Sequence, residues 1–110
     1  MAVKANILID QGTDYSTTIF VSDGNDVAID ITGYSFAASA RKHFTSNTAY
    51  NFTLTITDGV QGEVTMSMNA ATTANISAGR YVYDCEMTDT SSVVTRLVEG
   101  LLTVKPQVTR

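Results

Sequence analysis

Residues 81–88 read Tyr-Val-Tyr-Asp-Cys-Glu-Met-Thr, and in this stretch apolar and polar side chains alternate. Successive side chains of a β-strand point to opposite faces, so the pattern predicts a strand with one buried face. The side chains expected on that face are Tyr81, Tyr83, Cys85 and Met87. The same period of two recurs over 50–57, over 64–68 and, more weakly, over 15–21. A chain with several such segments is predicted to be all-β.

Turn-forming residues separate these segments. The stretch Asp-Gly-Asn-Asp at 23–26 predicts a turn into a further strand over 27–31, and Asp-Thr-Ser-Ser at 89–92 predicts a hairpin onto a long strand over 93–104. Asn69 is a suitable N-cap for one short helical turn over 69–75. We therefore expect a single domain, 1–110, built as a β-sandwich of about seven or eight short antiparallel strands with one short helical turn.

The start of the 81–88 strand gives a more specific indication. Residues 76–83 read Ile-Ser-Ala-Gly-Arg-Tyr-Val-Tyr, which is similar to the tyrosine corner of immunoglobulin-like sandwiches, where a tyrosine hydroxyl bonds back to the backbone a few residues upstream. Tyr81 would carry that role, although an ordinary core tyrosine would give the same pattern. We assign structural roles to Tyr81, Tyr83, Cys85 and Leu97, the last on the partner strand of the hairpin.

Composition limits the possible functions. The chain has 110 residues with one cysteine and one histidine, so it cannot form an internal disulfide or a multi-histidine metal site. We expect no metal, no cofactor and no small-molecule substrate. A net charge of −4 with seven basic residues argues against binding to nucleic acid or to an anionic membrane. Neither a signal peptide nor a membrane-spanning apolar run is recognisable, so a soluble protein made without secretion is expected.

No residue forms a convincing catalytic site. His43 follows two basic residues at a predicted strand end, where solvent exposure is a simpler interpretation than general-base catalysis. Asp84 and Glu86 lie two apart on one strand face, and we expect them to pair with Arg96 across the hairpin rather than to act on a glycosidic bond. Cys85 falls on the buried face and is expected to behave as a small apolar residue. These residues predict a protein that is not an enzyme.

Several phrases in the chain carry a resemblance to a known family. Residues 78–89 read Ala-Gly-Arg-Tyr-Val-Tyr-Asp-Cys-Glu-Met-Thr-Asp, followed by Val-Val-Thr-Arg-Leu-Val-Glu-Gly at 93–100 and Leu-Thr-Val-Lys-Pro-Gln-Val-Thr-Arg at 102–110. Earlier in the chain stand Asp-Gln-Gly-Thr-Asp-Tyr at 10–15 and Asp-Ile-Thr-Gly-Tyr at 30–34. In this order the phrases resemble small virion structural proteins of tailed phages, of the T4-like cyanophage type. Related sequences also resemble β-sandwich domains of phage tail and baseplate proteins.

The resemblance implies a non-enzymatic structural component of a virion, made in the cytoplasm of the infected cell. It implies assembly in multiple copies through contacts with other virion proteins and with copies of itself, in the neck, tail, baseplate or capsid decoration. The alternative is a virion-surface binding module for a host glycan or protein, for which Tyr15, Tyr34 and Tyr50 are the candidate aromatic residues. Residues 107–110 follow Pro106 and can form an extended C-terminal arm, so we expect Val108 and Arg110 at an intersubunit contact.

Overall fold

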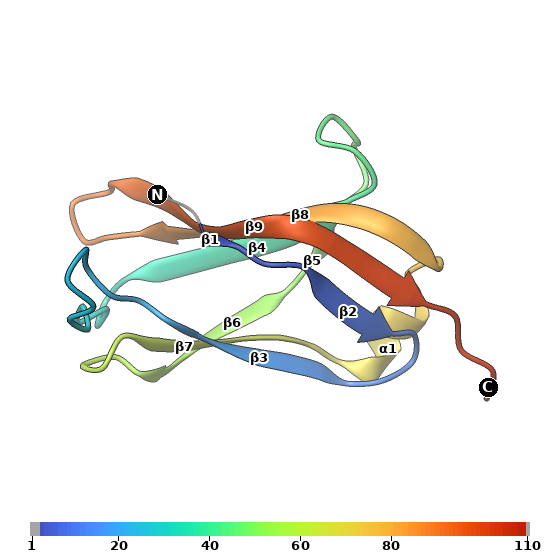
Figure 1. Cartoon of the computed structure of the whole chain (residues 1–110), viewed down its shortest axis with the longest axis horizontal. Helices are drawn as coiled ribbons and strands as arrows, with labels where there is room; N and C mark the ends of the chain where they lie inside the picture. Colours follow the sequence, from blue (N-terminus) through green and yellow to red (C-terminus); the bar gives the residue numbers. More distant parts are fainter. Residues whose placement is uncertain (1–2, 110) are drawn as a thin grey trace.

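Two β-sheets face each other in the structure, a computed structural model that describes residues 3–109 (Figure 1). The strands of the larger sheet are β1 (Val3–Lys4), β2 (Ile7–Asp10), β4 (Ser35–Arg41), β5 (Tyr50–Asn51), β8 (Gly79–Thr88) and β9 (Val94–Lys105). The strands of the smaller sheet are β3 (Tyr15–Phe20), β6 (Thr53–Asp58) and β7 (Glu63–Met68). The sequence predicted about seven or eight strands, and residues 3–109 form nine. The expected strand over 27–31 is missing, whereas two short strands form near the N-terminus and the 50–58 segment is divided into two.

The order of the strands is that of an immunoglobulin-like sandwich. The larger sheet runs β1-β9-β8-β4-β5, with β2 also on β9, and the smaller sheet runs β3-β7-β6. The second, fifth and fourth strands of an immunoglobulin domain are neighbours in one sheet, and its third, sixth and seventh strands are neighbours in the other. The triplets β3-β7-β6 and β4-β8-β9 reproduce this arrangement. The predicted all-β, immunoglobulin-like fold is confirmed.

The sequence predicted antiparallel strands, but the two N-terminal strands pair in parallel. Both β1 and β2 run parallel to β9, with Val3 opposite Val98 and Ile9 opposite Val104. A parallel pair needs a long connection, and here nearly the whole chain lies between the partners. The first strand therefore lies beside the last, and the position beside β3 is left without a strand from residues 3–109.

Two segments differ from the pattern that the sequence predicts. Residues 50–58 form two strands in different sheets, because the chain crosses from β5 to β6 at Phe52. Residues 27–31 do not form the expected strand and make only one isolated bridge, between Ser22 and Ala28. They are held instead by the N–H of Ile29, which donates to Val21 O, and by the N–H of Ile31, which donates to Gly59 O.

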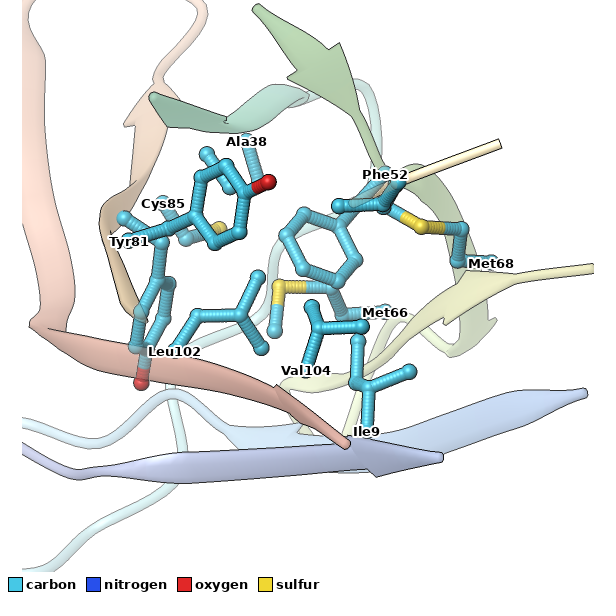
Figure 2. Packing of buried hydrophobic residues seen from close by; sticks show 12 residues of the cluster. Ile9, Ala38, Phe52, Met66, Met68, Tyr81, Cys85, Leu102 and Val104 are labelled. Atoms are coloured by element: carbon cyan, nitrogen blue, oxygen red, sulfur yellow. The ribbon is translucent and has the colours of Figure 1, made fainter. Parts of the chain in front are cut away.

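The core lies between the sheets and follows the predicted alternation. On β8 the side chains of Tyr81, Tyr83, Cys85 and Met87 are all buried, as are Val64, Met66 and Met68 on β7. Figure 2 shows how Met66 and Phe52 from the smaller-sheet side meet Leu102 and Val104 of β9. A second buried cluster of Val21, Ile31, Val64 and Met87 fills the other end of the sandwich.

The one helix described within residues 3–109 is α1 (Ala70–Ala74), which lies between β7 and β8 as predicted. Its N-cap is Asn69, whose side-chain Oδ1 accepts a hydrogen bond from Thr72 N at 2.8 Å. Thr73 is completely buried, and its hydroxyl donates to Thr13 O at 2.8 Å. Burial of that hydroxyl with its partner ties the helical turn to the loop between β2 and β3.

Candidate functional site

Tyr81 stands at the start of β8 with a side chain that is 5% exposed. Its hydroxyl donates to the carbonyl oxygen of Ser77 at 2.7 Å, four residues upstream. This is the contact that a tyrosine corner makes. The ring also packs edge-on against Tyr50, and the ammonium of Lys42 lies 4.8 Å from its centroid. Burial is the main reason that the Tyr81 pKa is raised, followed by the neighbouring Tyr50.

Tyr83 joins the sheet to the N-terminal segment. Its hydroxyl donates to Ala5 O at 2.5 Å, between β1 and β2. A Cβ on Gly100, which lies opposite Tyr83 on β9, would come within 2.2 Å of the same carbonyl oxygen. The absence of a side chain at Gly100 therefore makes room for the contact. Burial raises the Tyr83 pKa to about 12, with smaller effects from Tyr15 and Cys85.

Cys85 is completely buried on the inner face of β8 and is a free thiol. Burial is the main cause that raises its pKa to about 11, and the negative charges of Asp84 and Glu86 add to the shift. A thiol nucleophile needs the opposite shift, because the thiolate is the reactive form. The geometry of Cys85 is therefore that of a packing residue.

Leu97, to which the sequence assigned a structural role in the hairpin, is half-buried. The register of β9 on β8 shifts here: Cys85 lies opposite Val98, Glu86 lies opposite Arg96, and Leu97 is the extra residue of a β-bulge. The bulge reverses the alternation, so Leu97 packs against the second cluster while Val98 packs against the first. Gly100 is regularly paired with Tyr83.

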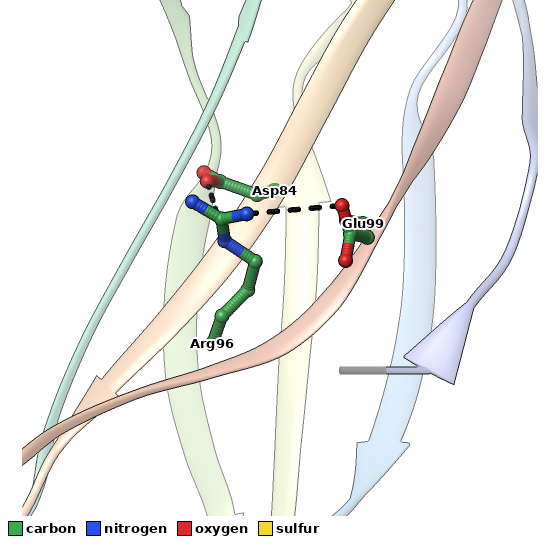
Figure 3. Close-up of polar contacts among 3 residues, drawn as sticks. All are labelled: Asp84, Arg96 and Glu99. Carbon is green, nitrogen blue, oxygen red and sulfur yellow. Dashed lines mark ion pairs between the residues drawn. The ribbon is translucent and has the colours of Figure 1, made fainter. Parts of the chain in front are cut away.

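The outer face of the larger sheet carries the ion pairs (Figure 3). Arg96 Nε lies 3.2 Å from Asp84 Oδ2, and Arg96 Nη1 lies 3.7 Å from Glu99 Oε1. The expected pairing of Arg96 across the hairpin is present with Asp84, although Glu86 is its Cα partner in the register. The Arg96 side chain is 47% exposed, so these pairs contribute little to stability. Asp84, Arg96 and Glu99 do place charges of both signs on this face.

A hollow of about 490 Å³ lies on the same outer face, over β4, β8 and β9. Apolar side chains of Val82, Leu101 and Phe44 line it together with Arg41, and the charged group just described borders it. Phe44 is 82% exposed on the loop after β4, and Leu101 is 39% exposed. Sequence reasoning missed Phe44, because a loop residue takes part in no alternation. We call this area, with Lys4, Asp84, Arg96 and Glu99, the outer-sheet surface.

The proposed C-terminal contact falls partly within the described residues. Val108 is 91% exposed, and Arg110 lies outside the described range. Gln107 is attached to the domain, since its N–H donates to Gln11 Oε1 at 3.1 Å. Its side-chain amide also occupies the space where a Cβ on Gly12 would lie. An extended arm therefore begins after Gln107 and not at it.

The remaining candidates are dispersed. His43 is exposed at the end of β4, and residues 3–109 contain no group of three or more His, Cys, Asp or Glu side chains placed to hold a metal ion. Tyr15, Tyr34 and Tyr50 are each half-buried and do not form an exposed aromatic platform. Within the same range no helix has the length and apolar character needed to cross a membrane.

Comparisons with known proteins bear on the fold. No protein-family model matches the chain, and no curated protein matches it. An internalin-like protein of Listeria monocytogenes is similar in structure, with a TM-score of 0.50 and 16% identity over 94% of this chain. Murine CRIg aligns over 93% of this chain and 92% of its own, with a TM-score of 0.42 and 10% identity. The chain spans 28% of the length of the internalin-like protein, and at this identity the similarity concerns the fold alone.

Proposed function

We propose that the protein is a non-enzymatic structural component of a tailed-phage virion that assembles in multiple copies through protein contacts. Its partners are other virion proteins and copies of itself, and its location is the virion. The resemblance described above supports this proposal, because its phrases extend in order over nearly the whole chain. An immunoglobulin-like sandwich is compatible with such a role, but a fold of this kind serves many functions.

The outer-sheet surface is the observation that carries the proposal. It has an apolar centre of Phe44, Leu101 and Val82, bordered by charges of both signs. An apolar centre with a polar rim is the usual anatomy of a protein interface. Lys4, Arg41 and Arg96 supply the positive charges, Asp84 and Glu99 the negative ones, and Arg96 pairs with both carboxylates. A protein partner fits it best.

The size of the domain suggests how such contacts would add up. One face of a domain this small offers at most a standard interface of about 800 Å². Many copies in a symmetric particle make later contacts effectively intramolecular, with avidity gains on the order of 10²–10⁴. A modest outer-sheet surface is therefore sufficient for stable incorporation.

The experiment that tests the proposal begins with purified particles of the phage that encodes the chain. Mass spectrometry and antibody labelling of these particles are expected to detect the protein at one defined location. The variant Phe44→Ala is then expected to reduce incorporation, while the control Val27→Ala, at another exposed apolar residue, is expected to incorporate normally. Absence of the protein from purified particles would exclude a virion role. Equal incorporation of both variants would exclude the outer-sheet surface as the contact.

A further inference from the structure

The outer edge of β3 is an unprotected strand edge. β3 ends the smaller sheet, and no strand among residues 3–109 pairs with its other side. In the usual constant-domain plan the first strand lies beside the second, but here β1 and β2 pair with β9 instead. The position next to β3 is thus open. A hollow of about 480 Å³ lies between β3 on one side and β1, β2 and β9 on the other.

The composition of β3 is unlike that of a protected edge. Natural sheets protect their edges with charges, proline, bulges or very short strands. Residues 15–20 read Tyr-Ser-Thr-Thr-Ile-Phe, without charge or proline, and pair with β7 in an unbroken register. The other edges carry such protection: β5 has two residues, β6 has a register shift between Ile56 and Asp58, and the β1–β2 edge is interrupted and carries Lys4 and Asp10.

The backbone of β3 presents its free groups at alternate residues. The N–H of Val21 donates to Gly62 O at 2.8 Å, across the junction with β7. Alternation along an antiparallel ladder then directs the N–H and C=O of the odd residues toward β7 and those of Ser16, Thr18 and Phe20 outward. These outward groups form a row that a further strand can pair with. Phe20 is 67% exposed at the end of this row.

From these observations we propose that β3 pairs antiparallel with β3 of a second copy, about a two-fold axis at Thr17 or Thr18. In an antiparallel pair about a two-fold axis, residues close to the axis lie opposite the same residue, or a residue near it in sequence, in the second copy. Any charge on this strand would therefore meet its like, and the strand carries none. Either register sets Thr18 of one copy opposite Ser16 or Thr18 of the other, and hydroxyl pairs of this type are favourable.

Asp14 and Asp23 flank the strand but lie outside residues 15–20, so they fall at the ends of the pair and away from its axis. Asp14 precedes β3, and its Oδ1 accepts the N–H of Ala70 at 2.7 Å at the start of α1. The pairing joins two three-stranded sheets into one of six strands. A contact made mainly by one strand pair is smaller than the standard interface of about 800 Å² per partner, so the dimer is expected to be weak and dependent on concentration. This inference does not rest on a place in a virion, because the isolated chain is enough to test it.

Sedimentation equilibrium of the full chain between about 10 µM and 1 mM tests the dimer, since that range covers weak interfaces. The wild type is expected to shift from monomer to dimer with concentration. Thr18→Lys places like charges near the axis, and their repulsion should weaken association by about tenfold or more. This weakening should be smaller in high salt, because salt screens the repulsion. Thr55→Lys is the matched control, because Thr55 and Thr18 are both exposed and both lie opposite Thr65 of β7.

A charge-swap experiment separates pairing from misfolding. Thr18→Lys and Thr18→Glu are each expected to associate about tenfold or more weakly than the wild type, while an equal mixture of the two is expected to dimerise at lower concentrations than either alone. A wild type that stays monomeric throughout the concentration range would overturn the proposal, and a strand of another protein would then be the occupant of this edge. A Thr18→Lys variant that dimerises as strongly as the wild type, or a Thr55→Lys variant that is weakened equally, would also overturn it.

Discussion

The hydroxyl of Tyr83 donates to the carbonyl oxygen of Ala5 at 2.5 Å, across 78 residues of sequence. Gly100 makes this contact possible, because a Cβ there would lie 2.2 Å from the same oxygen. The N–H of Ala5 in turn donates to Glu99 O at 2.9 Å, and Asn6 Oδ1 accepts the N–H of Leu101. Hydrogen bonds from β8 and β9 therefore fix the segment between β1 and β2.

The substitution Gly100→Ala is expected to destabilise the fold by about 1–3 kcal/mol, because the new methyl group must displace the Ala5 carbonyl. Urea melts measure the loss. Gly24→Ala is the control, since a Cβ at Gly24 has nothing within 4 Å, and its effect is expected to stay within about 0.5 kcal/mol. If the two substitutions cost the same, the Ala5 segment moves aside freely and is not fixed by this contact.

Tyr81→Phe is expected to cost about 1–3 kcal/mol, because it leaves the Ser77 carbonyl without its donor. Tyr83→Phe is expected to cost a similar amount, because its hydroxyl also donates to a backbone carbonyl. Tyr34→Phe, at a half-buried tyrosine whose hydroxyl bonds to nothing among residues 3–109, is the control. Thermal melts that show no loss for Tyr81→Phe would exclude the tyrosine corner as a stabilising contact.

Alternation predicted where side chains face but not which sheet a strand joins. Tyr50, Phe52 and Leu54 all face the interior, as expected, yet the chain changes sheets at Phe52. Both sheets present their inner faces to the same core, so the period of two continues through the crossing and conceals it. The hairpin of β8 and β9 and the N-cap at Asn69 could be predicted because their signals are local.

The features that escaped sequence reasoning depend on distant parts of the chain. The bulge at Leu97 is marked in the sequence only by two neighbouring apolar residues, Leu97 and Val98. Gly100 is required by Ala5, which is far away in sequence. Phe20 was missed for another reason. Alternation predicts that Phe20 points outward, since its neighbour Ile19 points inward, but the sequence does not show that β3 is an edge strand.

Leu102→Ala is expected to cost about 2–5 kcal/mol, because Leu102 is completely buried in the first cluster. Leu97→Ala should cost clearly less, about 1–2 kcal/mol, because its side chain is half-buried at the bulge. Urea melts of the two variants give the order. A larger loss for Leu97→Ala would mean that Leu97 stabilises the second cluster more than its half-buried position indicates.

Stability is expected to fall as the pH rises above 9. The pKa of Cys85 is raised from 9.0 to about 11 and that of Tyr83 from 10.0 to about 12, mainly by burial. The unfolded chain therefore loses these protons first, so the folded state binds more protons and the free energy of unfolding decreases with pH. Stability should be complete below pH 9 and fall between 9 and 12.

Chemical denaturation at a series of pH values measures this decrease. The variant Cys85→Ala is expected to lose the part of the decrease that lies between pH 9 and 11, while the part from Tyr83 remains between 10 and 12. The folded wild type is also expected to resist thiol reagents at neutral pH, because the thiol is buried. A wild type and a Cys85→Ala variant with the same pH profile would contradict the assignment to the thiol.

Removal of residues 108–110 is expected to leave the melt of the isolated domain within about 0.5 kcal/mol of the wild type, because Val108 is 91% exposed. Removal of 107–110 should cost more, about 0.5–1.5 kcal/mol. It removes the N–H that donates to Gln11 Oε1, and Gln11 Nε2 in turn donates to the carbonyl of buried Ile76 at 2.8 Å. The first truncation therefore tests the arm, and the second tests its anchor.

Under the proposed virion role, incorporation into particles separates a contact made by Val108 from the anchoring of Gln107 on the domain. If Val108 makes an intersubunit contact, the 108–110 truncation incorporates poorly although its melt is unchanged. Ordering an extended end costs about 1–2 kcal/mol of backbone entropy per residue, so the contact must be repeated in many copies to be useful. Normal incorporation of the shorter chain would show that the end is a free tail, and the contacts would then belong to the outer-sheet surface or to the edge of β3.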